Sequence, residues 1–203
     1  MTDLVLVRHG ETEWNRTGRV QGRTDIPLND TGRAQAREAG RRLADDAFDA
    51  VVASPLSRAA ETARIIAREI GASDDVELVD ALVERDYGDA EGMTGAEIDA
   101  AFAGHLLARE SREQTVERVL PALLDLARRH PGQRVLVVSH GGVIGSLVRH
   151  ATRWAWPEHG VRIENGSDHV FRVEDGVLTL VSSAGRAWSD ALLPSEEPVR
   201  TAD

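Results

Sequence analysis

Leu4-Val5-Leu6-Val7-Arg8-His9-Gly10-Glu11-Thr12 is the stretch that decides the fold of this chain. A run of four apolar residues this short, bounded by polar residues, predicts a strand buried on both faces rather than a helix. Arg8 and His9 then fall at the carboxyl end of the strand, where open α/β sheets bind ligands. Because neighbouring strand residues point to opposite faces, the two side chains share one pocket only if the chain bends near Gly10. Taken alone, the segment also fits a strand that ends in a solvated Arg-His pair.

A second apolar run at residues 135–138 repeats this arrangement, since Ser139-His140-Gly141-Gly142 follows it directly. Residues 143–152 then have the pattern of a helix that packs back on the sheet. A second histidine is thus expected at a strand end. The paired glycines leave room for a bound group, and the first free N–H groups of the helix form an anion cradle, for which phosphate is the obvious candidate.

A third strand ends at residues 50–53, where Ser54-Pro55-Leu56-Ser57-Arg58 begins a helix. We expect Ser54 as the N-cap and Pro55 at the first helical position. Arg58 then lies in the first turn, where a cation opposes the helix dipole by a few tenths to about 1 kcal/mol unless an anion is bound nearby. This mismatch indicates an anion site, although an exposed arginine on a helix surface would explain Arg58 in isolation.

These segments together resemble the histidine phosphatase superfamily, in the branch that contains cofactor-dependent phosphoglycerate mutase and its phosphatase relatives. The resemblance covers nearly the whole chain, and several separated motifs in order are more specific than a lone Arg-His-Gly. The segments that carry it are Arg8-His9-Gly10-Glu11-Thr12-Glu13-Trp14-Asn15, Gln21-Gly22-Arg23-Thr24-Asp25-Ile26-Pro27-Leu28, Thr31-Gly32-Arg33-Ala34-Gln35-Ala36, Ser54-Pro55-Leu56-Ser57-Arg58-Ala59, Glu84 and Ser139-His140-Gly141-Gly142.

The resemblance implies a reaction through a phosphohistidine on His9, whose neutral imidazole is nucleophilic near pH 7. It also implies that cationic and polar groups surround the phosphoryl oxygens and stabilise the transition state. We expect no metal and no cofactor, because arginines can supply the positive charge that magnesium supplies elsewhere. The residues expected around the phosphoryl group or the substrate are Arg8, Asn15, Gln21, Gly22, Arg58, His140 and the N–H of Gly141.

Glu84 is the candidate acid and base. A carboxyl group beside the pocket could protonate the leaving alkoxide and later accept a proton from the attacking water. Glu84 lies in Leu82-Val83-Glu84-Arg85-Asp86-Tyr87-Gly88, which resembles the acid-bearing loop of the family. Without that resemblance, Glu84 and its acidic neighbours Asp86, Asp89 and Glu91 fit a solvated acidic loop equally well.

The composition fits one soluble intracellular domain. The chain has 203 residues, 41% of them hydrophobic, which suffices for a single core. It contains no cysteine, which excludes disulfides and thiolate chemistry, and its 24 basic residues are all arginine. The net charge of −10 argues against nucleic acid or an anionic membrane as a partner. We expect a cytoplasmic protein with a small phosphomonoester as its partner, and a homodimer is left open.

Strands at residues 3–7, 48–53, 75–80 and 133–139 alternate with helices at 31–45, 55–71 and 142–153. This order predicts an α/β three-layer sandwich, with a mostly parallel central sheet and helices on both faces. Residues 169–173 and 177–181 flank Glu174-Asp175-Gly176, a hairpin signal that adds an antiparallel strand at one edge. We predict one domain over residues 1–190 and a flexible tail over 191–203.

Residues 91–113 favour hydrolysis over phosphoryl transfer within the enzyme. In the mutase branch an insertion after the acid-bearing loop supplies basic residues, whereas this segment is short and carries mostly small and acidic side chains. A short lid leaves the site open to water. We therefore expect a metal-independent phosphomonoester hydrolase; the alternatives are a cofactor-dependent phosphoglycerate mutase and a non-catalytic phosphate-binding regulatory protein. The five remaining histidines, at positions 105, 130, 150, 159 and 169, are expected at the surface or at helix ends.

Overall fold

The computed structural model describes residues 1–103, 109–156 and 162–188. The seven strands in this part of the chain form one sheet in the order β3-β2-β4-β1-β5-β6-β7. β3, β2, β4 and β1 are parallel to one another, and β5, β6 and β7 are added antiparallel beside β1. The strands are β1 (Thr2–Arg8), β2 (Ala50–Ala53), β3 (Glu77–Leu78), β4 (Arg134–Ser139), β5 (Asp168–Glu174), β6 (Val177–Ser183) and β7 (Arg186–Ala187).

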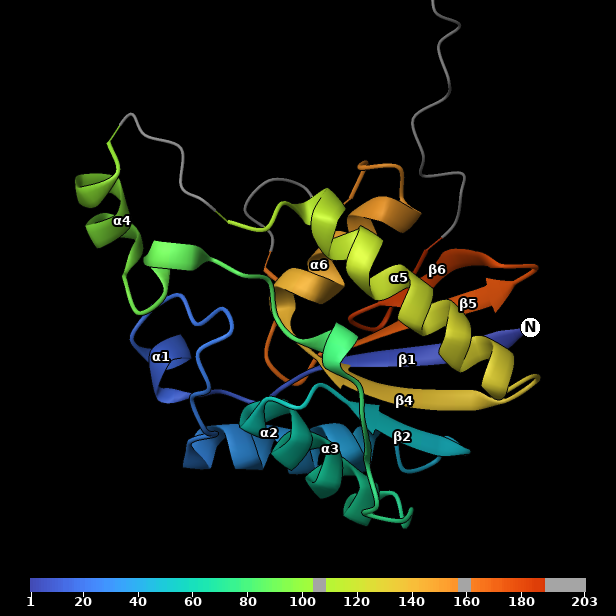
Figure 1. The fold of residues 1–203 in the computed structure, drawn as a ribbon. Coiled ribbons are helices and arrows are strands. Elements are labelled where there is room, and N and C mark those ends of the chain that lie inside the picture. Colours follow the sequence, from blue (N-terminus) through green and yellow to red (C-terminus); the bar gives the residue numbers. More distant parts are fainter. Residues whose placement is uncertain (104–108, 157–161, 189–203) are drawn as a thin grey trace, which may run out of the picture.

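Helices cover both faces of this sheet, with α5 and α6 on one side and α2 and α3 on the other (Figure 1). The short helices α1 and α4 lie beyond the carboxyl ends of the parallel strands (Figure 1). The predicted three-layer α/β sandwich is therefore confirmed, with the antiparallel strands at one side. The helices are α1 (Glu13–Arg16), α2 (Asp30–Arg42), α3 (Ser57–Glu69), α4 (Gly95–Ala101), α5 (Arg112–Arg129) and α6 (Gly141–Ala151), with short 3₁₀ turns at Asp80–Leu82 and Gly88–Ala90.

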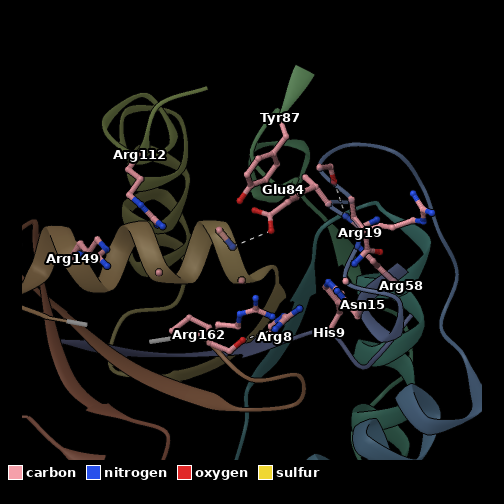
Figure 2. A pocket seen from close by; sticks show the side chains of 18 residues that line it. Arg8, His9, Asn15, Arg19, Arg58, Glu84, Tyr87, Arg112, Arg149 and Arg162 are labelled. Atoms are coloured by element: carbon pink, nitrogen blue, oxygen red, sulfur yellow. Dashed lines mark hydrogen bonds between the residues drawn. The ribbon is translucent and has the colours of Figure 1, made fainter. Parts of the chain in front are cut away.

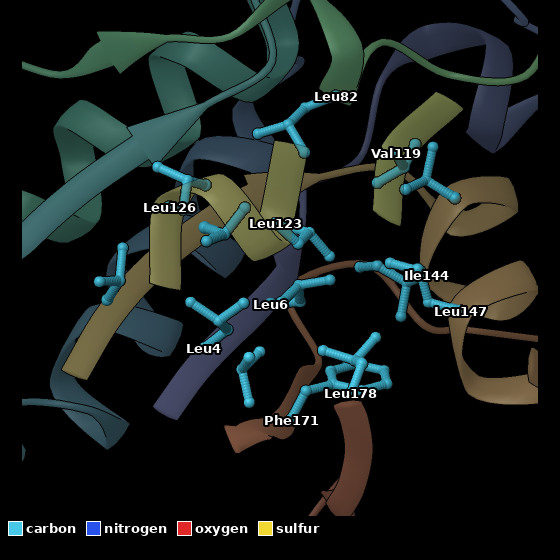
Figure 3. Packing of buried hydrophobic residues seen from close by; sticks show 14 of the residues in the cluster. Leu4, Leu6, Leu82, Val119, Leu123, Leu126, Ile144, Leu147, Phe171 and Leu178 are labelled. Carbon is cyan, nitrogen blue, oxygen red and sulfur yellow. The ribbon is translucent and has the colours of Figure 1, made fainter. Parts of the chain in front are cut away.

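Alternate residues of β1 divide the core into two clusters, one on each face of the sheet. Leu4 and Leu6 pack with side chains of α5, α6, β5 and β6 (Figure 3). Val5 and Val7 pack with α2 and α3 on the opposite face. All four side chains are fully buried, and each such burial contributes about 1.5–3 kcal/mol. The short apolar run is therefore the central strand of the sheet, as predicted.

The carboxyl ends of β1 and β4 are neighbours, because the two strands pair in parallel with Arg8 opposite Ser139. The residue after each strand, His9 and His140, is consequently delivered to the same edge. Gly10 is needed here for a reason other than the bend that the sequence suggested. A Cβ on Gly10 would lie 2.2 Å from the carbonyl oxygen of Gly32 in α2, so the loop can approach this helix only without a side chain.

The start of α3 differs from its prediction. Leu56 is the N-cap and its side chain cannot accept a capping hydrogen bond, while the hydroxyl of Ser54 contacts the ring of His140. The backbone N–H and the hydroxyl of Ser57 both donate to a carboxylate oxygen of Asp25, which caps the helix from a distant loop. The local capping pattern was therefore wrong because the Ser54 hydroxyl is used in a tertiary contact.

Several other expectations are corrected or lie outside the described residues. β3 has two residues where residues 75–80 were expected, and β7 was not predicted. His169 is buried on β5, between the hydroxyls of Ser167 and Ser183, so its predicted surface position is wrong. His105, His159 and the predicted tail over residues 191–203 lie outside the described ranges. In those ranges, every helix is too short or too polar to span a bilayer.

Candidate active site

A cavity of about 330 Å³ opens at the carboxyl ends of β1 and β4 (Figure 2). Most of the residues singled out in the sequence line it, although they come from six separate segments. The predicted residues among its lining are Arg8, His9, Asn15, Gln21, Gly22, Arg58, Glu84 and Gly141. His140 is not among them, although it lies directly behind His9.

The ring of His9 is held in one orientation by its own loop. Its Nδ1 lies 2.6 Å from the carbonyl oxygen of Gly10, so Nδ1 carries the hydrogen and donates it. Nε2 makes no hydrogen bond with the described residues. Burial lowers the pKa of His9 well below its usual value, and the charges of Arg8 and Arg58 lower it further. The imidazole is therefore neutral and nucleophilic near pH 7.

His140 is fully buried, and its ring packs edge-on against His9 with centroids 5.2 Å apart. Its Nε2 lies 2.8 Å from the hydroxyl of Ser54. Its Nδ1 is buried and has no hydrogen-bond partner. Burial lowers the pKa of His140 well below its usual value, with smaller contributions from Arg58, His9 and Arg8. His140 is thus a neutral ring beside His9, with one ring nitrogen that makes no hydrogen bond.

Arg8 and Arg58 place positive charge on either side of His9. Arg8 donates from Nη1 to the carbonyl oxygen of Ile163, and its buried Nε has no partner. Arg58 is fully buried; its Nη2 donates to Gly22 O at 2.8 Å, and its Nε also has no partner. Burial lowers the pKa of both arginines. Buried donors without partners in a cavity are poised for an anionic ligand.

Glu91, one of the acidic neighbours of Glu84 in the sequence, holds the wall of the cavity. Glu91 accepts hydrogen bonds from the backbone N–H groups of Arg23 and Thr24, each at 2.9 Å. This fixes the loop whose carbonyl oxygens at Gly22 and Thr24 orient Arg58. Gly22 has a φ of +55°, and a Cβ there would overlap the Glu91 carboxylate.

Glu84 is buried at the N-terminus of α6, facing the cavity. Its carboxylate accepts a hydrogen bond from the N–H of Gly142 at 2.9 Å (Figure 2). It also accepts from the N–H groups of Val143 at 3.1 Å and Arg85 at 2.8 Å. The helix N–H groups expected to cradle phosphate are therefore occupied at Gly142 and Val143. Gly141, the position singled out as a donor, is the first residue of the helix and lines the cavity.

Asn15 and Gln21 are held by α1 and its surroundings. Asn15 Oδ1 accepts from the N–H of Thr12 in a capping box and from Asn165 Nδ2, both at 3.3 Å. Gln21 Oε1 accepts from the Thr12 hydroxyl at 2.9 Å. With both side-chain oxygens engaged, the amide N–H groups of Asn15 and Gln21 are the donors left for a ligand.

The sequence did not indicate six further residues that line the cavity, Arg19, Tyr87, Arg112, Gly145, Arg149 and Arg162. The spacing of residues in one predicted helix could have indicated two of them. Gly141, Gly145 and Arg149 are spaced by four residues on a segment expected to be helical, so they share a face of α6. Arg112 and Arg162 approach from other segments, and no local pattern indicates them.

The fold and this site define an α/β enzyme that transfers phosphoryl groups, with a neutral histidine among buried arginines. Comparison with protein families agrees, because the model of the histidine phosphatase superfamily (branch 1) matches residues 4–184. The chain belongs to the histidine phosphatase superfamily, and it is a phosphatase. The family match leaves the domain boundary at residue 190 a prediction.

Similar proteins include both phosphatases and mutases. The chain is 42% identical to "Uncharacterized phosphatase PhoE" of Bacillus subtilis over 149 residues, which cover 73% of this chain and 76% of that one. It is 36% identical to a 2,3-bisphosphoglycerate-dependent phosphoglycerate mutase of Parvibaculum lavamentivorans over 191 residues, 85% and 90% of the two chains. Among solved structures, a mycobacterial glucosyl-3-phosphoglycerate phosphatase in complex with VO3 superposes with a TM-score of 0.78 at 30% identity, over 88% of this chain and 96% of that one.

Proposed function

We propose that the protein hydrolyses small phosphomonoesters through a phosphohistidine on His9, without a metal ion. The observation that carries this proposal is the fixed ring of His9, whose Nδ1 is held by Gly10 while Nε2 is free in a cavity between Arg8 and Arg58. An imidazole with one nitrogen fixed and the other free is the arrangement that nucleophilic catalysis needs.

The proposed reaction has two steps. His9 Nε2 attacks phosphorus, the P–O bond to the substrate breaks, and the leaving oxygen takes the carboxyl proton of Glu84, which must be protonated before this step. A water molecule then attacks phosphorus, Glu84 accepts its proton, and the N–P bond breaks to release phosphate. Arg8, Arg58 and the donors of Asn15, Gln21, Gly141 and the ring of His140 would stabilise the charge on the phosphoryl oxygens.

Arginines supply the positive charge in this scheme. Six of them line the cavity, against one carboxylate, Glu84, among its described lining residues. In the same ranges, no group of three or more His, Asp or Glu side chains is arranged to hold a metal ion. The donor set therefore suits the oxygens of a phosphate better than a cation.

The covalent intermediate is the direct test. With a substrate labelled in its phosphoryl group and EDTA in excess, alkaline quenching during turnover should recover label on the protein, and acid quenching should lose it. His9→Ala should abolish labelling and lower turnover by more than about a thousandfold. His150→Ala, at an exposed position, is the matched control and should label fully. Full labelling of the His9 variant would assign the nucleophile elsewhere.

Mutase activity is the second candidate, because similar proteins carry that name. The described part of residues 91–113 contributes only Arg112 to the cavity lining, which supports an accessible mouth. A mutase must keep its phosphoenzyme from water, whereas a phosphatase must admit water. With 3-phosphoglycerate and catalytic 2,3-bisphosphoglycerate, we expect little interconversion relative to hydrolysis of a preferred monoester. Rapid isomerisation with negligible free phosphate would identify a mutase.

We also retain the cytoplasmic location as a prediction, which the absence of cysteine supports. We also predict a small-molecule phosphomonoester as the partner, and neither nucleic acid nor membrane. A homodimer stays open as a prediction. A non-catalytic phosphate-binding role is the third alternative, and turnover of p-nitrophenyl phosphate would eliminate it.

A further inference from the structure

The cavity holds more positive charge than one phosphoryl group requires. Six arginines and one carboxylate line it among the described residues. Arg8 and Arg58 flank His9, and Arg19 already forms an ion pair with a carboxylate outside the cavity. Of the remaining five arginines, Glu84 and a phosphomonoester dianion bound at His9 would balance three. Two positive charges would then stay unbalanced at the end of the cavity that contains Arg112, Arg149 and Arg162 (Figure 2).

Arg112 and Arg149 are half-buried at the cavity, yet they have no partner in the described part of the chain. Neither side chain makes a hydrogen bond or an ion pair with any residue in the described ranges, and Arg149 Nε is buried without a partner. By contrast, Arg118, also on α5, donates to Glu110 at 2.8 and 2.9 Å and to two carbonyl oxygens. Burial of a guanidinium donor removes its hydrogen bonds to water, and without a protein partner no hydrogen bond replaces them, so the burial costs free energy.

The position of Arg112 adds a second cost. Arg112 is the first residue of α5, directly after the N-cap Ser111, so its charge faces the positive end of the helix dipole. Burial lowers the pKa of Arg112, and repulsion by Arg85 and Arg149 lowers it further, with Glu84 acting in the opposite direction. A bound anion would relieve both the repulsion and the dipole mismatch.

The face of α6 sets the distance between the two ends of the cavity. Gly141, Gly145 and Arg149 follow one another at intervals of four residues, and the glycines leave the surface open. A Cβ on Gly141 would lie 3.2 Å from Arg8 Nε, and a Cβ on Gly145 would lie 3.5 Å from Arg112 Nη1. The two Cβ positions are about one helical turn apart, on the order of 6 Å, so Arg8 and Arg112 lie against successive turns of the same face of α6.

We propose that Arg112 and Arg149 form a second anion site, and that the preferred substrates are phosphomonoesters with a carboxylate or a second phosphate about one helical turn from the reacting phosphate. Arg162 borders the same end of the cavity. The inference rests on the proposed function, because it assigns the reacting phosphate to the end of the cavity that contains His9.

A series of ω-carboxyalkyl phosphates with two to six carbons tests this proposal, each compared with the uncharged alkyl phosphate of the same length. At one chain length, kcat/KM should exceed that of the uncharged partner by at least about tenfold, since charge-assisted hydrogen bonds contribute on that scale. Alkane-α,ω-bisphosphates of the same lengths show whether the distal group is a carboxylate or a phosphate.

Variants assign the preference to residues. Arg112→Gln and Arg149→Gln should each lower kcat/KM for the best charged substrate about tenfold, and change it less than about twofold for the uncharged alkyl phosphate. Arg64→Gln removes the same charge from an exposed position on α3 outside the cavity, and should leave both values unchanged. An equal effect of all three variants would show that the preference for charged substrates comes from the overall charge of the protein, which would contradict a second anion site at Arg112 and Arg149.

The two proposals fail in different ways. Hydrolysis of p-nitrophenyl phosphate with equal rates for charged and uncharged esters would overturn the second anion site and leave the phosphatase mechanism standing. No hydrolysis of any ester would overturn the proposed function. In that case calorimetry can compare the affinities for an ω-carboxyalkyl phosphate and for the alkyl phosphate of the same length. Equal affinities would contradict the second anion site.

Discussion

His9 shows how one hydrogen bond sets the role of a side chain. The Gly10 carbonyl fixes the hydrogen on Nδ1, and the buried, arginine-rich surroundings keep the ring neutral. The same conditions make His140 neutral, but its Nε2 contacts Ser54. Two histidines at equivalent strand ends therefore differ in which ring nitrogen is free, which supports attack by His9.

Glu84→Gln separates acid catalysis from positioning. The amide retains the shape of the side chain but cannot donate a carboxyl proton, so poor leaving groups should suffer most. We expect a loss of about a hundredfold in kcat/KM with alkyl phosphates, and only a few-fold with p-nitrophenyl phosphate, whose departing oxygen hardly needs a proton. Asp89→Asn, at an exposed position in the same acidic segment, should change neither value. Equal losses on both substrates would assign Glu84 to positioning.

At the scale of the element, α6 is the scaffold of the site. Its first N–H groups hold Glu84, and its glycines at positions 141, 142 and 145 keep the cavity floor open. A helix without side chains on one face lets a ligand and the acid-bearing loop approach its backbone closely. The geometry of the site thus depends on small residues as much as on charged ones.

Gly142→Ala tests this scaffold. A Cβ at this position would lie 2.5 Å from Glu84 Oε1 and 3.0 Å from both Arg85 Cδ and the Tyr87 hydroxyl, so the acid must move. Hydrolysis of alkyl phosphates should fall by about tenfold or more, with a smaller loss on p-nitrophenyl phosphate. Gly95→Ala, at the first position of α4 with no atom within 4 Å of the new Cβ, is the matched control. Unchanged selectivity in the α6 variant would show that Glu84 tolerates displacement.

At the scale of the whole molecule, an acidic chain with a net charge of −10 surrounds a strongly basic cavity. Three histidines, His9, His140 and His169, are buried. Burial is the largest cause of the lowered pKa in each of them, and it brings the pKa of His169 to about 4. The folded state therefore excludes protons that the unfolded chain would bind in mild acid.

Stability should fall as the pH is lowered, because of these histidines. Between pH 6.5 and about 4 the unfolded chain binds a proton at position 169 and the folded chain does not. The unfolding free energy therefore falls as the pH drops through this range, and the neutral His169 costs no stability above pH 6.5. His169 alone should remove about 3 kcal/mol of unfolding free energy across that range. Urea unfolding at pH 7 and pH 4 measures the drop in unfolding free energy between the two pH values. This drop should be smaller by about 3 kcal/mol in His169→Gln than in the unchanged protein. Parallel pH profiles for the two proteins would contradict the assignment.

Much of the fold followed from local patterns in the sequence. Apolar runs at residues 4–7 and 135–138 are central strands because they are short and bounded by polar residues, and the Asp175-Gly176 turn forms the predicted hairpin with both residues at positive φ. The pairing of His9 and His140 followed from topology, since the carboxyl ends of parallel strands meet at one edge. These features depend on periodicity and on turn chemistry, which are properties of neighbouring residues.

What the sequence by itself determined is therefore the order of the elements and the side chains that stand at the strand ends. Only the tertiary structure decided that Ser54 contacts His140 rather than capping α3, that His169 is buried, and that Glu84 takes the N–H groups of α6. It also decided that Arg112 and Arg149 face the same cavity as His9. The physical reason is that such contacts join segments far apart in the chain, and their geometry is set by how the layers pack and not by any local pattern.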